Sequence, residues 1–192
     1  MLSWMLKFLD FIGIDRAVAY TLTLRIWQIF AGLGTILFVT FYFSPVQQGF
    51  YYTFASVLAL QVFFELGLTY VVLQFASHEK AFLEWTINRT LVGSETAKAR
   101  LGALMRLTLR WYGVATVLMI LCLIPLGLLF FGKSIDATEA LNWQPSWILL
   151  VVTTACNLFL SPLFATLEGC GMVAEVAKYR TIQDISAYSL FW

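Results

Sequence analysis

The sequence predicts an all-α polytopic membrane protein, and three observations support this fold class. Of the 192 residues, 60% are apolar and only 12% are charged, whereas soluble proteins are about 45–50% apolar and about 25% charged. Four apolar runs reach roughly 20 residues, the length at which a helix crosses a hydrocarbon core of about 30 Å. The charged residues gather mainly between these runs. A water-soluble domain is therefore not expected.

The predicted elements begin with an interfacial helix over residues 1–21. Its apolar residues lie on one face, with Lys7 and Asp10 on the other, a pattern typical of helices that lie in the membrane surface. Charges interrupt the apolar run, which argues against a cleaved signal peptide. Four complete transmembrane helices are then expected, at residues 22–43, 49–76, 111–132 and 147–167.

The connections between these spans also carry information. Ser44 and Pro45 end the first helix, and the short loop makes the first two helices antiparallel neighbours. Residues 78–110 are expected to form a cytoplasmic amphipathic connector, in which Ser94 and Glu95 begin a new helix that runs into the third span. Residues 185–192 are apolar but far too few to span a membrane. They predict a truncated fifth helix, and we expect the sequence to be a fragment.

Basic residues set the expected orientation. Eleven of the 12 Lys and Arg residues fall on the side of the N-terminus, and only Lys133 falls on the other side. Loops rich in Lys and Arg are retained in the cytoplasm. The N-terminus is therefore predicted to be cytoplasmic.

Several function classes find no support in the sequence. A net charge of +1 offers no electrostatic footprint for nucleic acid. No Gly-rich phosphate loop is present, so no ATPase is expected. The single His78 makes no metal site with the three cysteines and no catalytic triad with a serine. We therefore expect neither an enzyme nor a cofactor or metal.

Two charged residues inside predicted spans are the main candidates for a site. Arg25 and Glu65 lie about 27 and 24 Å from the outer ends of the first two spans, at 1.5 Å per residue. This places them at similar depth on adjacent helices, where they can pair. One interpretation is an ion pair that fixes helix register. The other is that Arg25 meets an anionic substrate, with Glu65 holding it or exchanging a proton.

Other polar residues at membrane depth extend this candidate set. Gln28 and Gln61 offer amides either for hydrogen bonds between helices or for a hydrated path. Arg106 and Arg110 lie one turn apart where the third span meets the interface, which favours binding to anionic lipid headgroups. The role of Glu168, beside Gly169 at the mouth of the fourth span, is left open.

The order of several motifs resembles one family. Arg25 is followed by residues 44–52 (SPVQQGFYY), 63–68 (FFELGL) and 167–169 (LEG), and then by Tyr179, Arg180 and Gln183. This order resembles polysaccharide-biosynthesis membrane proteins of the multidrug/oligosaccharidyl-lipid/polysaccharide exporter superfamily. The resemblance covers residues 25 to 184, less than half of a typical member with twelve or more helices in two lobes. Glu65 stands where members often have Asp.

The resemblance implies a partial N-terminal lobe of a two-lobe transporter in the bacterial inner membrane. Its implied function is the transport of lipid-linked oligosaccharides, such as O-antigen units on undecaprenyl pyrophosphate. Arg25 would then be the cationic candidate for pyrophosphate. The implied partners are membrane lipids, the polyprenyl-pyrophosphate-linked sugar, and glycosyltransferases or a polymerase of the same pathway.

Two other functions remain open at this point. A multidrug exporter of the same superfamily would use Glu65 to bind cationic ligands. A small structural membrane subunit would have four helices by design. With one lobe only, we expect the 192 residues alone not to transport.

Overall fold

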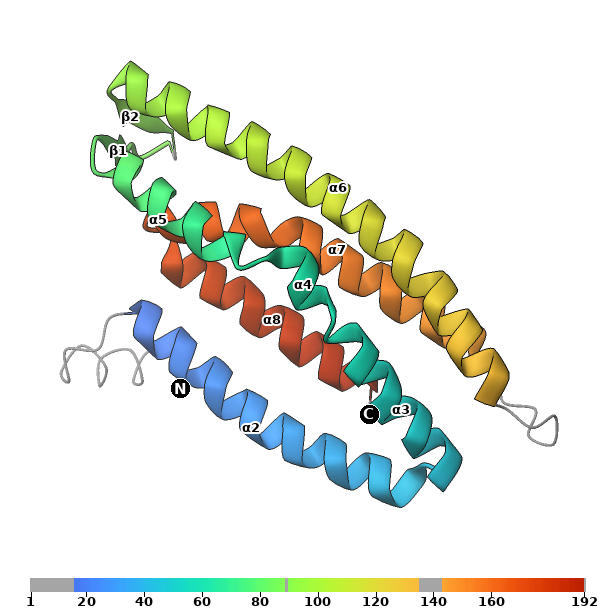
Figure 1. Cartoon of the computed structure of the whole chain (residues 1–192). Coiled ribbons are helices and arrows are strands. Elements are labelled where there is room, and N and C mark those ends of the chain that lie inside the picture. The colour runs from blue at the N-terminus through green and yellow to red at the C-terminus, as the bar shows by residue number, and fades with distance from the viewer. Residues whose placement is uncertain (1–15, 89, 135–142, 192) are drawn as a thin grey trace. The chain divides into compact units, whose positions relative to one another are not determined.

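The computed structural model describes residues 16–88, 90–134 and 143–191 (Figure 1). These residues form seven helices and one short hairpin, so the helical class is as predicted. Most of the expected interfacial helix at residues 1–21 lies outside the described residues, and residues 16–21 belong to the first described helix. The elements in chain order are α2 (Arg16–Tyr42), α3 (Pro45–Leu58), α4 (Gln61–Glu65), α5 (Leu68–Lys80), β1 (Leu83–Trp85), β2 (Leu91–Gly93), α6 (Glu95–Ser134), α7 (Gln144–Gly169) and α8 (Val173–Phe191).

Three of the described helices are long and apolar enough to cross a membrane. They are Val18–Tyr42 in α2, Glu95–Gly132 in α6 and Gln144–Gly169 in α7. A fourth span results if Pro45–Glu65 and Leu68–Lys80, which meet at a bend of 44°, count as one. Three or four helices of this length and composition are those of an all-α, multi-pass membrane protein.

The chain divides into two compact units. The first comprises Met1–Gln48 and Gly171–Trp192, in which α2 packs against α8. The second comprises Gly49–Cys170, in which α7 packs against both α5 and α6.

The second span differs from the single helix expected over residues 49–76. The structure breaks it into α3, α4 and α5. Leu66 (φ 52°) and Gly67 (φ 67°) both adopt the left-handed conformation between α4 and α5. Glycine enters this region freely, whereas leucine does so at a cost. The apolar composition of the segment gave little sign of this break, because one glycine inside an apolar run is compatible with a continuous helix.

Close helix contacts in the second unit depend on two glycines. A β-carbon on Gly127 of α6 would lie 2.1 Å from Nε1 of Trp147, a fully buried residue of α7. A β-carbon on Gly169 would lie 2.6 Å from the carbonyl oxygen of Leu73 in α5 and 2.7 Å from the β-carbon of Ala76. Small residues let membrane helices approach closely, so these positions hold α7 against both neighbours.

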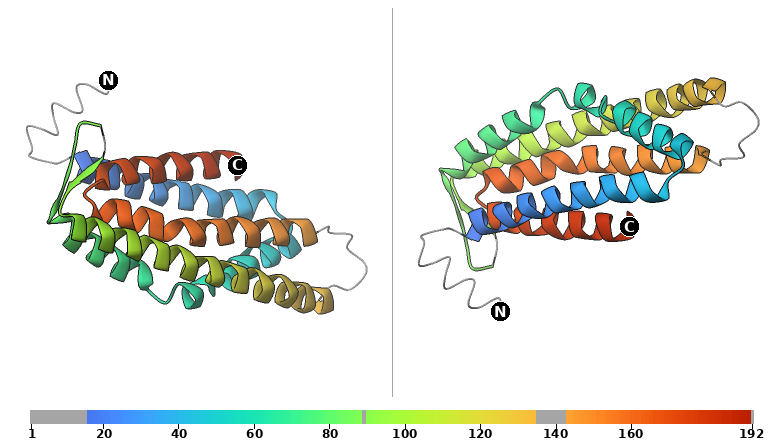
Figure 2. Two further views of the ribbon diagram at one scale, coloured as in Figure 1. Left: turned by 90° about the horizontal axis from the view of Figure 1, so that it is seen from above. Right: turned by 90° about the horizontal axis from the view of Figure 1, so that it is seen from below.

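The predicted connector at residues 78–110 contains an antiparallel hairpin and the first turns of a long helix. The hairpin pairs Leu83 with Gly93 and Trp85 with Leu91, and it lies beside the ends of α5 and α6 (Figure 2). Helix α6 begins at Glu95, directly after Ser94, and continues without a break through the predicted third span to Ser134. The predicted fourth span, residues 147–167, lies within α7.

Helix α8 unites two segments for which the sequence predicts separate elements. The charged stretch after the fourth span and the apolar residues from 185 onward form one continuous helix, Val173–Phe191. It is not among the three helices that can cross a membrane by length and composition. Within the described residues, the expected truncated fifth helix is therefore the second half of α8.

Candidate binding site at a broken helix

A polar cluster lies at the break of the second span. Glu65, the last residue of α4, accepts a short hydrogen bond from the Thr69 hydroxyl in α5. The same Thr69 oxygen lies 2.9 Å from the Tyr112 hydroxyl of α6 and 2.8 Å from the Ser161 hydroxyl of α7. We call Glu65, Thr69, Tyr112 and Ser161 the Glu65 cluster. It joins four helices through a single threonine oxygen.

Local structure explains how these groups meet. The left-handed residues Leu66 and Gly67 turn the chain between Glu65 and Thr69. Tyr112 is fully buried, and a buried tyrosine hydroxyl normally finds a hydrogen-bond partner. The turn brings the Thr69 hydroxyl to it. The break thus interrupts the backbone hydrogen bonds of the span and supplies a hydroxyl that meets Tyr112 of α6 and Ser161 of α7.

Gln61, a predicted site residue, lies one helical turn before Glu65 in α4. Its side chain is half-buried, and its Oε1 atom is buried without a hydrogen-bond partner in the described part of the chain. Leaving a buried acceptor unpaired costs about 1–3 kcal/mol. Residues four apart share a helix face, so Gln61 lies on the same face of α4 as Glu65, and its Oε1 atom is a buried acceptor whose hydrogen-bonding capacity no described residue uses.

The first unit holds a second polar chain, which includes two predicted residues. Arg25 is exposed on α2, and its Nη1 donates to Gln28 Oε1 at 3.2 Å. Gln28 Nε2 in turn donates to Asp184 Oδ2 of α8 at 2.7 Å. Asp184 therefore orients Gln28, and Gln28 orients the arginine. Sequence reasoning did not select Asp184, because only the packing of α8 on α2 gives it this role.

Arg25 and Glu65 belong to different compact units, and each has polar partners within its own unit. The predicted pairing of these two residues stays a prediction.

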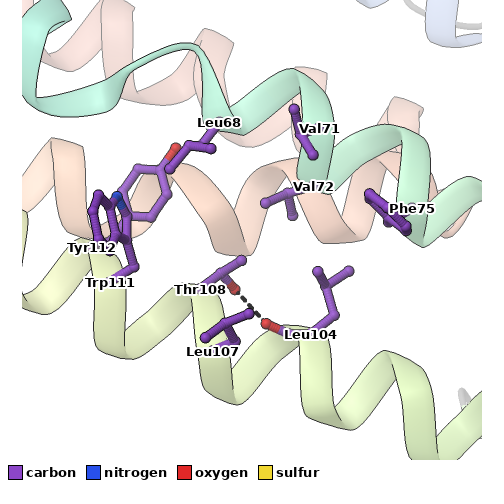
Figure 3. Close-up of a pocket in the computed structure, with 9 residues that line it drawn as sticks. All are labelled: Leu68, Val71, Val72, Phe75, Leu104, Leu107, Thr108, Trp111 and Tyr112. Carbon is purple, nitrogen blue, oxygen red and sulfur yellow. Dashed lines mark hydrogen bonds between the residues drawn. The ribbon is translucent and has the colours of Figure 1, made fainter.

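An apolar pocket of about 440 Å³ lies between α5 and α6 (Figure 3). Side chains of the two helices face one another across it, among them Val72 and Phe75 of α5 and Leu107 and Trp111 of α6. The ring of Tyr112 also lines this pocket, while its hydroxyl belongs to the cluster. An apolar cavity and a polar group thus adjoin at one residue.

The predicted headgroup residues Arg106 and Arg110 are exposed on α6. A β-carbon placed on Gly102 would lie 3.6 Å from Nη1 of Arg106. The guanidinium of Arg106 therefore lies back over the preceding turn, toward the N-terminal end of α6. Long basic side chains extend in this way from an apolar surface to water or headgroups.

The hairpin end of the second unit holds a buried thiol. Trp85 Nε1 donates to the Cys170 carbonyl oxygen at 2.8 Å. Burial raises the pKa of the Cys170 thiol, and the positive charge of Lys80 partly offsets this rise in pKa. Among the described residues, no group of three or more His, Cys, Asp or Glu side chains could hold a metal ion.

Comparison of the chain with protein-family models, curated proteins and solved structures found no match.

Proposed function

We propose that this chain takes part in the transport of a lipid-linked oligosaccharide across the bacterial inner membrane. In this proposal the N-terminus and the hairpin face the cytoplasm, as the distribution of Lys and Arg favours. The observation that carries the proposal is the break at Leu66 and Gly67, which leads directly into the Glu65 cluster. Broken helices beside polar groups at membrane depth are typical of transporter binding sites.

The second unit supplies groups suited to sugar hydroxyls. The Glu65 carboxylate and the Gln61 amide oxygen accept hydrogen bonds, and the cluster hydroxyls both donate and accept them. A sugar needs such mixed partners. The polyprenyl tail of the substrate stays in lipid and needs no closed pocket, which fits the low polarity of the rest of the unit.

The first unit supplies a cation for the pyrophosphate. Arg25 is exposed and is held by Gln28, which Asp184 orients in turn. A guanidinium binds phosphate oxygens through two parallel hydrogen bonds. An arginine fixed by neighbours loses less conformational freedom on binding than a free one. We assign pyrophosphate binding to Arg25, and we expect glycosyltransferases or a polymerase of the pathway as partners.

A binding titration tests this proposal. The purified chain in lipid nanodiscs is titrated with undecaprenyl-pyrophosphate-linked oligosaccharide. Arg25→Gln should weaken binding about tenfold or more, since hydrogen bonds to charged groups contribute about 1.5–3 kcal/mol. Arg25→Lys should retain part of the affinity. Lys178→Gln, which removes an exposed charge of the same unit, should have no effect. Equal affinity for all four proteins would contradict the proposal.

A multidrug exporter is the second candidate, and one observation favours it. The Glu65 carboxylate accepts a hydrogen bond from the Thr69 hydroxyl, and no ion pair of Glu65 occurs among the described residues. An acid beside an apolar pocket suits a cationic, apolar ligand. Titration with cationic dyes separates the two functions: tight dye binding that Glu65→Gln abolishes and Glu84→Gln preserves would favour the exporter.

A further inference from the structure

Two apolar pockets meet along one side of α6. The first, of about 440 Å³, is lined by α6 residues from Leu104 to Tyr112. The second, of about 160 Å³, is lined by Val114, Leu118 and residues of α4. Both include Trp111. We call the combined feature the α6 groove. Leu107 is 67% exposed and Trp111 is 49% exposed, so the groove opens to the surroundings of the protein.

The length of the α6 groove matches one membrane leaflet. Leu104 and Leu118 are separated by about 21 Å along the helix axis. One leaflet, with its interfacial layer, is about 20–23 Å thick. Thr108 also lines the wider pocket. Its hydroxyl donates a hydrogen bond to the Leu104 carbonyl oxygen at 2.9 Å. The wall thus presents hydrocarbon along its length and suits an acyl chain.

Positive charge flanks the same part of α6. Arg110 lies three residues after Leu107 and four before Val114, which puts its β-carbon about 5–6 Å from each of these groove residues. Arg106 lies one turn earlier, with its guanidinium over Gly102. Both arginines are exposed, and neither forms an ion pair with another described residue. The positive charge therefore flanks the N-terminal half of the α6 groove.

We propose that the α6 groove binds one anionic phospholipid from the leaflet on the basic side of the membrane. Its acyl chain lies against Leu107 and Trp111, and its phosphate contacts Arg106 and Arg110. A phospholipid is favoured over a rare polyprenyl lipid because phospholipid is the solvent of this exposed face. A net negative headgroup is favoured because each basic residue near the surface strengthens its binding. This inference does not depend on the proposed transport function.

Quenching of Trp111 fluorescence tests the proposal. The full chain is placed in phosphatidylcholine nanodiscs that contain increasing fractions of dibrominated phosphatidylglycerol or dibrominated phosphatidylcholine, because bromine quenches a tryptophan that it contacts. The Trp111 signal is the difference between the unaltered chain and Trp111→Phe. Half-quenching should need about fivefold less brominated phosphatidylglycerol than phosphatidylcholine for each arginine that binds the headgroup.

Variants and competitors decide the outcome. In the double variant Arg106→Gln/Arg110→Gln, both brominated lipids should quench Trp111 equally. Lys98→Gln removes a charge nearer the N-terminus of α6 and should keep the preference for phosphatidylglycerol. A thermal unfolding curve for each variant establishes that it is folded. Equal quenching of the unaltered chain by both lipids would overturn the proposal, as would a preference that survives in the double variant. Relief of quenching by a low fraction of polyprenyl phosphate would assign the groove to that lipid and also overturn it.

Discussion

The Tyr112 hydroxyl of α6 lies 2.9 Å from the hydroxyl of Thr69 in α5, so a side chain at the start of the predicted third span is tied to the break in the second span. Tyr112 also lines the apolar pocket between the two helices. This residue therefore connects the polar and apolar parts of the candidate site, and its hydroxyl can be removed without removing its ring.

Tyr112→Phe should lower the free energy of unfolding by about 0.6–1.7 kcal/mol, which spans the average and the largest values for hydrogen bonds between membrane helices. The ring keeps its packing, and the Thr69 hydroxyl loses one partner. Unfolding by denaturant in mixed micelles measures the change. Tyr70→Phe, at a 76% exposed position, is the matched control and should have almost no effect. Equal effects of the two substitutions would contradict the role given to Tyr112.

Gly67→Ala should destabilise the protein by about 1–2 kcal/mol, since an L residue pays this cost in the left-handed region. No atom lies within 4 Å of the added β-carbon, so the cost comes from the backbone alone. Gly32→Ala, in the regular helix α2 and equally open, should instead stabilise by about 0.5–1 kcal/mol. Thermal unfolding of both variants in one detergent makes the comparison. If both substitutions changed the stability in the same direction, residue 67 would not have a left-handed backbone conformation.

Gly169→Ala should cost about 1–3 kcal/mol through overpacking. The new methyl group would lie 2.6 Å from the Leu73 carbonyl oxygen, and a backbone atom cannot move aside as a flexible side chain can. Gly132→Ala, near the end of α6 with no atom within 4 Å, is the control. A loss of unfolding free energy confined to Gly169→Ala is expected. No loss at this position would mean that α7 does not approach α5 this closely.

Alkylation of Cys170 should have an unusual pH dependence. The thiolate is the reactive form, and the raised pKa of Cys170 lowers the thiolate fraction near neutral pH. Its labelling rate should therefore keep rising at pH values where an ordinary cysteine is already fully ionised. Lys80→Gln removes the charge that lowers this pKa and should move the rate profile to still higher pH. Maleimide labelling in a Cys122→Ser/Cys156→Ser background measures both profiles.

A labelling profile of Cys170 that matches that of free cysteine would contradict this assignment. Slow labelling with an ordinary pH midpoint would show that access, and not the pKa, limits the reaction.

The apolar pattern of the sequence predicted much of the helix layout for a physical reason. A helix that crosses the hydrocarbon core needs a long apolar run, so the apolar runs of the sequence are enough to predict the spans within α6 and α7. Ser94 followed by Glu95 predicts the start of α6. The break at Leu66 was not predictable in this way. A left-handed leucine carries no compositional signal, and tertiary contacts maintain it against its local cost.

The candidate site was only partly accessible to sequence reasoning. Glu65 and Gln61 attract notice because polar groups are rare in apolar runs. Thr69, Tyr112 and Ser161 do not, since Ser, Thr and Tyr are ordinary in membrane helices and acquire meaning only when packing brings their hydroxyls together. The same holds for Asp184, which meets Gln28 across 156 residues of sequence.

The central claim is that the Glu65 cluster is a ligand-accessible polar site inside the membrane. Its most direct test is the reaction of Ser161→Cys, in a chain whose native cysteines are replaced, with a small water-soluble methanethiosulfonate reagent in native membranes. We expect residue 161 to react, lipid-linked oligosaccharide to slow this reaction, and Leu149→Cys on the exposed surface of α7 to stay unreactive. An unreactive residue 161, or a rate that the ligand leaves unchanged, would contradict it.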